Sequence, residues 1–141
     1  FVLLDDGHAR QEVSVFSEIF EASRAKLKDD ALLVIEGKIS EDRFNGGGAR
    51  VIADRIYDIA EAQSLFAQAL RLTLKDPSLL APLREILENR RGGACPIEID
   101  YHNQYAKCLL RLPENWQVTL HEDLLINLKN LLGDADVAVR Y

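Results

Sequence analysis

Hydrophobic and polar positions alternate through residues 31–54, as they do in a β-strand with one buried face. Over 31–40, Leu33, Ile35 and Ile39 share one face, while Glu36, Lys38 and Ser40 share the other. Gly37 lies inside this run, at a place where a strand can bend. The glycine-rich segment 45–48 can supply the positive φ angles of a tight turn, and 50–54 returns as a strand. The pattern therefore predicts two long strands joined as a hairpin.

A second pair of strands is predicted upstream, over residues 1–5 and 11–16, with the turn dipeptide Asp6-Gly7 between them. Ser17 can then cap a short helix, because its hydroxyl can accept a hydrogen bond from a free backbone N–H. The apolar stripe of that helix is predicted to comprise Phe16, Phe20 and Leu27. Residues 1–58 thus contain four predicted strands and a helix, an order that favours a small β-barrel that binds oligonucleotides.

A connecting helix is predicted over residues 59–68, and the boundary between two units falls there. Residues 69–141 follow the order β-α-β-β-α-β, a compact second domain. Asp76-Pro77 is expected to open its first helix, and Gly92-Gly93 to end it. Thr119 and Glu122 have the spacing of a capping box for the second helix. The whole chain is predicted to be an α+β protein.

Composition indicates a soluble globular protein, with 48% hydrophobic and 28% charged residues among 141. No apolar run approaches the ~20 residues of a membrane helix, so no membrane partner is expected. Met is absent even from position 1, which indicates a piece of a longer protein. Cys95 and Cys108 fall on the apolar phase of predicted strands. We therefore expect two buried free thiols and a reducing, cytoplasmic compartment.

The charge of the chain limits the kind of partner it can bind strongly. The formal net charge is −6. Residues 1–58 carry 8 Lys and Arg against 12 Asp and Glu, a net charge of −4, and residues 59–141 carry 9 against 11, a net charge of −2. Affinity for nucleic acid comes mainly from cations that meet phosphates. Any contact with DNA is therefore expected to be local, weak and salt-dependent.

A cationic group surrounds the predicted hairpin. Lys38, Arg43 and Arg50 accompany the aromatic Phe44, and Arg10 is expected to share their face. An aromatic ring between cations can stack on a base while the cations pair with phosphates. We therefore predict that these five residues form a weak site for single-stranded DNA. The alternative is a hairpin tip that is charged only for solubility, and two acidic residues in the same loop would weaken phosphate attraction.

No pattern of catalytic, metal-binding or cofactor-binding residues is recognisable. Asp5-Asp6 precede a glycine and are expected to build a turn, and the three histidines stand alone. The glycines at 46–48 lack the Lys-Ser/Thr and helix that follow in a phosphate-binding loop. Trp116 could stack on a base or pack against the core, and packing is the favoured interpretation. We expect no catalytic residue, metal or cofactor in this chain.

Two ordered sets of motifs resemble a known family. The segments FVLLDDGHARQEVSVFSEIFE and LLVIEGKISEDRFNGGGARVIADRIYDI are similar to the OB-fold module near the C-terminus of the bacterial DNA polymerase III alpha subunit. The run ALRLTL, the leucine-rich helix after it, and the terminal segment with Trp116 and the final Leu-Leu-Gly resemble the tau-binding region of that family. The resemblance covers essentially the whole chain.

The resemblance implies specific roles. The OB module would guide single-stranded template near the polymerase, and the domain at 69–141 would dock the tau subunit of the clamp loader. The parent would be a DNA-directed DNA polymerase, a nucleotidyltransferase, whose catalytic aspartates lie outside this chain. The remainder of the alpha subunit would then be a further partner. A protein-interaction scaffold with no intrinsic DNA binding is the alternative.

One departure from the family pattern is expected. An OB barrel has five strands, whereas residues 1–54 supply four. We therefore predict that the first strand precedes Phe1, and that residues 1–58 form a partial OB fold. Its open edge would leave backbone groups unpaired or covered by another chain.

Overall fold

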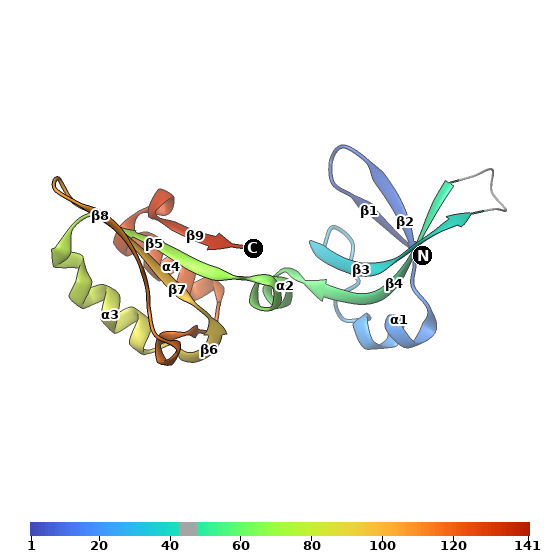
Figure 1. The fold of residues 1–141 in the computed structure, drawn as a ribbon. Helices are drawn as coiled ribbons and strands as arrows, with labels where there is room; N and C mark the ends of the chain where they lie inside the picture. The colour runs from blue at the N-terminus through green and yellow to red at the C-terminus, as the bar shows by residue number, and fades with distance from the viewer. Residues whose placement is uncertain (43–47) are drawn as a thin grey trace. The chain divides into compact units, whose positions relative to one another are not determined.

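The computed structural model describes residues 1–42 and 48–141. The chain divides into two compact units, Phe1–Ile59 and Ala60–Tyr141. Within the described residues there are two four-stranded sheets and four α-helices, and neither sheet closes into a barrel (Figure 1). The predicted α+β class is confirmed.

The first unit is built on two strand pairs. Its elements are β1 (Val2–Asp5), β2 (Arg10–Ser14), α1 (Ser17–Ser23), β3 (Leu33–Asp42) and β4 (Gly48–Asp58). The strands lie in the order β1-β2-β4-β3. Each hairpin is antiparallel, while the two inner strands, β2 and β4, run parallel to each other. One parallel contact therefore joins the two predicted hairpins into a single sheet.

A small core covers one face of this sheet. Its buried side chains are Val13, Ala53 and Ile56. Ile19 of α1 and Leu27 pack against them. The predicted stripe is wrong for Phe16 and Phe20, whose side chains are exposed. Ser17 is the first helical residue, and no side-chain hydrogen bond caps the helix. The helix is therefore held by packing of an aliphatic side chain.

Gly37 marks a β-bulge in the long hairpin, at the place where the sequence predicted a bend. The register between β3 and β4 shifts between Glu36 and Gly37, which leaves Asp54 as the extra residue on β4. A Cβ atom on Gly37 would lie 2.2 Å from the backbone oxygen of Ile52. Only glycine allows the two backbones to approach this closely.

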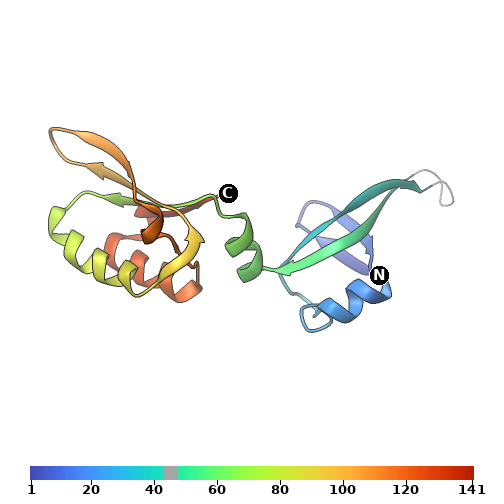
Figure 2. The ribbon, with the colours of Figure 1, turned by 60° about the horizontal axis from the view of Figure 1, so that its bottom comes forward.

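The second unit is a sheet with helices on one side (Figure 2). After α2 (Ile59–Phe66), its elements are β5 (Ala69–Leu74), a 3-10 turn η1 (Pro77–Leu79), α3 (Leu80–Glu88), β6 (Arg91–Cys95), β7 (Ile97–His102), β8 (Lys107–Arg111), η2 (Glu114–Trp116), α4 (Glu122–Leu132), η3 (Asp134–Asp136) and β9 (Val137–Arg140). The sheet order is β8-β7-β5-β9, with β5 and β7 parallel and the outer pairs antiparallel.

Aliphatic residues at alternate strand positions meet the apolar stripes of α3 and α4. The fully buried side chains of this core include Leu70, Leu72, Leu83, Ile97, Leu124 and Leu128. The alternation in the sequence therefore identified both the strands and the face that packs against the helices. Asp76 caps the turn before α3 as predicted, since its carboxylate accepts a hydrogen bond from the Ser78 N–H at 2.9 Å.

Two local predictions for the second unit are wrong. Gly92 and Gly93 do not end the first helix, which stops at Glu88, but lie in the additional strand β6. β6 bridges to Val118, and a Cβ on Gly93 would lie 2.1 Å from backbone atoms of Thr119 and Val118. The capping box is absent, because α4 starts at Glu122 with no side-chain cap.

The two thiols have different surroundings. Cys95 is buried as predicted, and burial raises the pKa of its thiol. Cys108 is exposed, which corrects the prediction. Its strand β8 is the edge of the sheet, where every residue is exposed. Among the described residues, no helix is both long and apolar enough to cross a membrane.

Candidate nucleic-acid interface on the first sheet

The strand register places three predicted DNA-contacting cations on the face of the first sheet opposite its core. Lys38 pairs with Ile52, and Arg50 lies two residues before Ile52 on the same strand. Ser14 on β2 also pairs with Ile52, and Arg10 lies four residues before Ser14. Since side chains two or four residues apart on a strand share a face, Arg10, Lys38 and Arg50 all point outward.

Arg10 is bound to a carboxylate at the first turn. Its Nε donates a hydrogen bond to Asp5 Oδ2 at 2.8 Å. The other oxygen of Asp5 accepts the Gly7 N–H at 2.8 Å, and Asp6 accepts the N–H groups of His8 and Ala9. The Gly7 hydrogen bond and then Arg10 lower the pKa of Asp5. Both acids therefore build the turn, as the sequence predicted.

Arg50 has a neutral partner. Its Nε donates to the hydroxyl oxygen of Ser14 at 3.2 Å, across the parallel β2–β4 contact. Ser14 is buried, whereas Arg50 is exposed, so the hydroxyl holds the base of the guanidinium in place and leaves its other N–H groups at the surface. Arg50 makes no ion pair among the described residues.

Lys38 lies near an acid supplied by the bulge. Its Nζ is 3.7 Å from Asp54 Oδ1, and the Lys38 side chain is 80% exposed. Such an exposed pair contributes little to stability and is readily exchanged for another anion. The bulge thus places a carboxylate beside a cation that would otherwise face solvent alone.

Away from the tip of the β3–β4 hairpin, the described outward face is electrically balanced. Its charged residues there are Arg10, Lys38, Arg50 and Arg55, and Asp5, Glu12, Glu36 and Asp54. Four cations oppose four acids, on a unit whose net charge is −4. The face can bind a phosphate through a guanidinium, but it produces no broad positive potential. The remaining predicted contacts, Arg43 and Phe44, lie outside the described residues.

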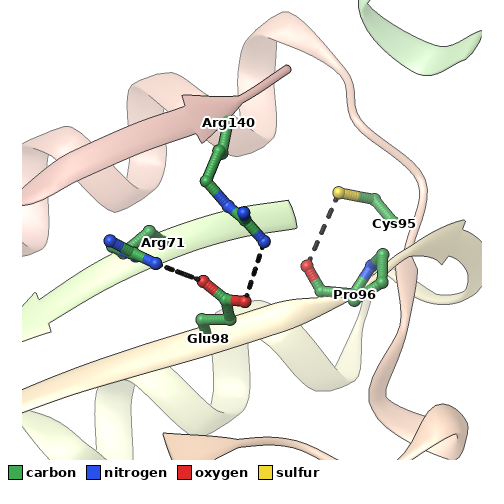
Figure 3. A network of polar contacts seen from close by, with 5 residues as sticks. All are labelled: Arg71, Cys95, Pro96, Glu98 and Arg140. Carbon is green, nitrogen blue, oxygen red and sulfur yellow. Dashed lines mark hydrogen bonds and ion pairs between the residues drawn. The ribbon is translucent and has the colours of Figure 1, made fainter. Parts of the chain in front are cut away.

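A second polar cluster lies on the second sheet and was missed in the sequence (Figure 3). Glu98 on β7 is buried, and its Oε2 accepts hydrogen bonds from Arg71 Nε at 3.1 Å and Nη2 at 2.8 Å. Its Oε1 accepts one from Arg140 Nη2 at 3.1 Å. The hydrogen bonds from Arg71 are the main cause that lowers the pKa of Glu98. The three residues come from three adjacent strands, β5, β7 and β9, so only the strand order could reveal their contact.

Comparisons with known proteins connect the whole chain to one family. Residues 82–133 match the family model described as DNA polymerase III subunit alpha, C-terminal domain. The DNA polymerase III subunit alpha of Pseudomonas aeruginosa is 41% identical over 145 aligned residues, which cover 100% of this chain. The corresponding subunits of Escherichia coli K12 and Vibrio cholerae are 32% and 33% identical over 98% of it.

The chain belongs to the DNA polymerase III subunit alpha family.

The chain spans 12% of the length of these alpha subunits. The region that matches the C-terminal-domain model of the family lies wholly in the second unit and runs from α3 through α4. The resemblance stated from the motifs is therefore confirmed at the level of the family.

Within the region matched by this polymerase family model, Trp116 packs against the core of the second unit and is half-buried. The guanidinium carbons of Arg91 and Arg84 lie 4.6 Å and 5.8 Å from the centre of its ring. Cations at these distances interact favourably with an indole face. The packing interpretation of Trp116 is the one that the structure supports.

The matched region of this chain also contains His102, one of the three histidines. His102 is the last residue of β7, half-buried, with its Nε2 2.8 Å from Asp100 Oδ1. The close contact with the His102 imidazole is the main cause that lowers the pKa of Asp100. In the part of the chain that the structure describes, no cluster of three or more His, Cys, Asp or Glu could hold a metal ion.

Proposed function

We propose that this chain is a non-catalytic part of a replicative DNA polymerase III alpha subunit in the bacterial cytoplasm. Its first unit contacts single-stranded DNA weakly, and its second unit docks the tau subunit of the clamp loader. The polymerase chemistry belongs to the remainder of the alpha subunit, which is a constant partner. Family membership over the whole chain is the observation on which this proposal rests.

The topology of the first sheet supports an OB-type DNA-binding module. In an OB barrel, strand 3 lies between strands 2 and 5 and runs parallel to strand 5. The observed order β1-β2-β4-β3, with β2 parallel to β4, matches strands 2, 3, 5 and 4 of such a barrel. Oligonucleotides bind OB folds on the face of strands 2 and 3 and at the loop between strands 4 and 5. These correspond to the outward face of β1–β2 and to the β3–β4 hairpin.

A groove in the first unit fits the place of the remaining OB strand. It has a volume of about 1070 Å³ and is lined mainly by residues 1–6 and 27–33, between the two edge strands. Phe1, Leu3 and Leu32 expose apolar surface there. In an OB barrel, strand 1 closes the gap between strands 2 and 4, which correspond to β1 and β3. We therefore assign this groove to a closing strand of the longer polymerase.

Titration of fluorescein-labelled oligo-dT with the 141-residue chain tests the DNA role. We expect weak binding at low salt and none at high salt, because the described part of the outward face has no net positive charge. Arg50→Gln should reduce the low-salt affinity and lower the slope of log K against log salt by about 0.7, the value for one phosphate contact on a single strand.

Arg24→Gln is the matched control for this titration. Arg24 follows α1 and is exposed, outside the sheet face, so the same loss of charge there should leave the salt slope unchanged. No binding of oligo-dT at low salt would remove the DNA role for this chain. An equal effect of the two substitutions would mean that net charge alone, and no site at Arg50, determines the affinity.

The docking role belongs to the second unit, in which the match to the C-terminal-domain model lies. We expect an immobilised C-terminal part of tau to retain the 141-residue chain, and to retain the Arg50→Gln variant equally well. A chain that passes through without retention would contradict the docking role.

A scaffold without DNA binding is the second candidate function. The acidic balance of the chain favours it, as does the equal number of cations and acids on the described outward face away from the hairpin tip. Retention by tau together with no binding of oligo-dT would select this candidate.

A further inference from the structure

The edge strand β8 (Lys107–Arg111) has an unpaired side that no described residue covers. Within the described part of the chain β8 pairs only with β7, and all five of its residues are exposed. Leu109 and Leu110 are 54% and 51% exposed, on opposite faces of the sheet. An exposed apolar edge of this kind is a template for another strand.

The phase of the β7–β8 hydrogen bonds identifies which backbone groups are free. Leu112 N–H donates to Ile97, and Asn103 N–H donates to Ala106, so these two opposed pairs are hydrogen-bonded. Hydrogen-bonded pairs alternate with non-bonded pairs along an antiparallel ladder. Cys108 and Leu110 therefore direct their backbone groups toward β7. Lys107, Leu109 and Arg111 direct theirs away from the sheet.

Charge at the two ends of β8 selects the partner. Lys107 and Arg111 make no hydrogen bond or ion pair with their side chains among the described residues. Arg111 lies opposite Glu98, but both oxygens of that carboxylate already accept from Arg71 and Arg140. The edge thus presents two cations that flank three apolar residues, Cys108, Leu109 and Leu110.

The same charges disfavour a second copy of this chain as the occupant. Antiparallel pairing of two β8 strands centred on Leu109 places Lys107 of each copy opposite Arg111 of the other. Parallel pairing places like residues side by side. Like charges directly opposite each other destabilise a strand pair.

The opposite edge of the sheet is less available. β9 has four residues, and its apolar residues Val137 and Val139 are buried and half-buried. β8 is therefore the edge of this sheet with both free backbone groups and exposed apolar side chains.

We propose that β8 binds an extended peptide segment as an added strand, with an apolar centre of three residues and an acidic residue on each side. Backbone groups of Lys107, Leu109 and Arg111 would pair with the segment, while its acids would face the two cations. The proposal stands apart from tau docking, because it concerns one strand and a short peptide of defined chemistry.

A labelled peptide with the core Glu-Val-Val-Val-Glu, flanked by serines, is the probe for the 141-residue chain. The core has the same pattern in both directions, so it suits parallel and antiparallel addition. We expect it to bind about tenfold more tightly than the same peptide with lysines in place of the glutamates. Proline at all three central positions should abolish binding in either direction, because no central residue could then donate an N–H to the free carbonyl groups of β8.

Variants of the protein test the same charges. Lys107→Glu combined with Arg111→Glu should reverse the preference, so that the lysine peptide binds more tightly. Lys129→Glu, on the exposed side of α4, is the matched control and should preserve the preference for the acidic peptide.

Amide hydrogen exchange on the unsubstituted chain gives a readout that does not depend on any variant. Binding of the acidic peptide should slow exchange at Leu109 and Arg111 and leave Cys108 and Leu110 unchanged. No binding of the acidic peptide, equal affinity for the two peptides, or protection without this alternation would overturn the proposal. Tau binding without peptide binding, or the reverse, separates this inference from the proposed docking role.

Discussion

At the scale of single residues, Glu98 is the buried acid of the second unit and the centre of its polar network. Its two carboxylate oxygens accept three hydrogen bonds from Arg71 and Arg140. Both arginines remain partly exposed, so each can keep water on its other N–H groups. A buried carboxylate with this set of donors is stable as a charge, whereas an unpaired one would not be.

Glu98→Gln should lower the free energy of unfolding of the second unit by about 1–3 kcal/mol at neutral pH, because hydrogen bonds to a charged group are lost. Urea unfolding followed by the fluorescence of Trp116, the chain's single tryptophan, measures this change. Glu85→Gln on the exposed side of α3 is the control and should change stability by less than about 0.5 kcal/mol.

The loss of stability caused by Glu98→Gln should become smaller as the pH falls. The folded-state pKa of Glu98 is lowered from its ordinary value of 4.5, so its stabilising contribution is complete above that value. The contribution is lost as the pH falls through the folded-state pKa, and the variant should then approach the original chain in stability. A difference between the two proteins that stays constant on acidification would contradict this account.

Residue-level predictions from the sequence succeeded where the physics is local. Asp5, Asp6 and Asp76 bond to backbone groups within a few residues, and Gly37 lies at a bulge in the strand where a bend was predicted. The prediction of a capping box at Thr119 was wrong. A Thr and a Glu three residues apart do not by themselves decide where a helix starts, and α4 starts at Glu122. The contact of Glu98 with its arginines depends on strand order, which one sequence does not specify.

At the scale of elements, alternation of apolar residues identified most strands but could not identify edges. Cys108 has the apolar phase of a buried residue, yet it is exposed because β8 has a neighbouring strand on one side only among the described residues. Gly92-Gly93 has the composition of a helix stop, yet both residues lie in β6, where Gly93 admits the backbone at Val118 and Thr119. Close backbone approach and helix termination both require glycine, and only the tertiary partner distinguishes them.

The candidate DNA site shows the same division between local and tertiary information. The hairpin and its cations follow from the sequence, since strand alternation places Lys38 and Arg50 on one face. Their partners, Asp54 and Ser14, arise from a bulge and from the parallel β2–β4 contact. Those partners make Arg50 the described cation best placed to meet a phosphate.

At the scale of the whole molecule, the two units have separate hydrophobic cores of very different size. The described core residues of the first unit are three buried side chains, while those of the second number thirteen. Small cores give marginal stability. We therefore expect two unfolding transitions, with the first unit unfolding at the lower denaturant concentration.

Gly37→Ala tests this independence. The added Cβ would lie 2.2 Å from the Ile52 oxygen, so the hairpin must shift, and we expect the first unit to lose about 1–3 kcal/mol of stability. Residue-resolved hydrogen exchange should show faster opening at Val13 and Ala53, and unchanged opening at Leu70 and Leu124. Gly48→Ala, where a Cβ meets no atom within 4 Å, should leave both groups of amides unchanged. Equally faster exchange in both groups of amides would mean that the two units unfold together as one cooperative body. A strain in the first unit would then destabilise both hydrophobic cores.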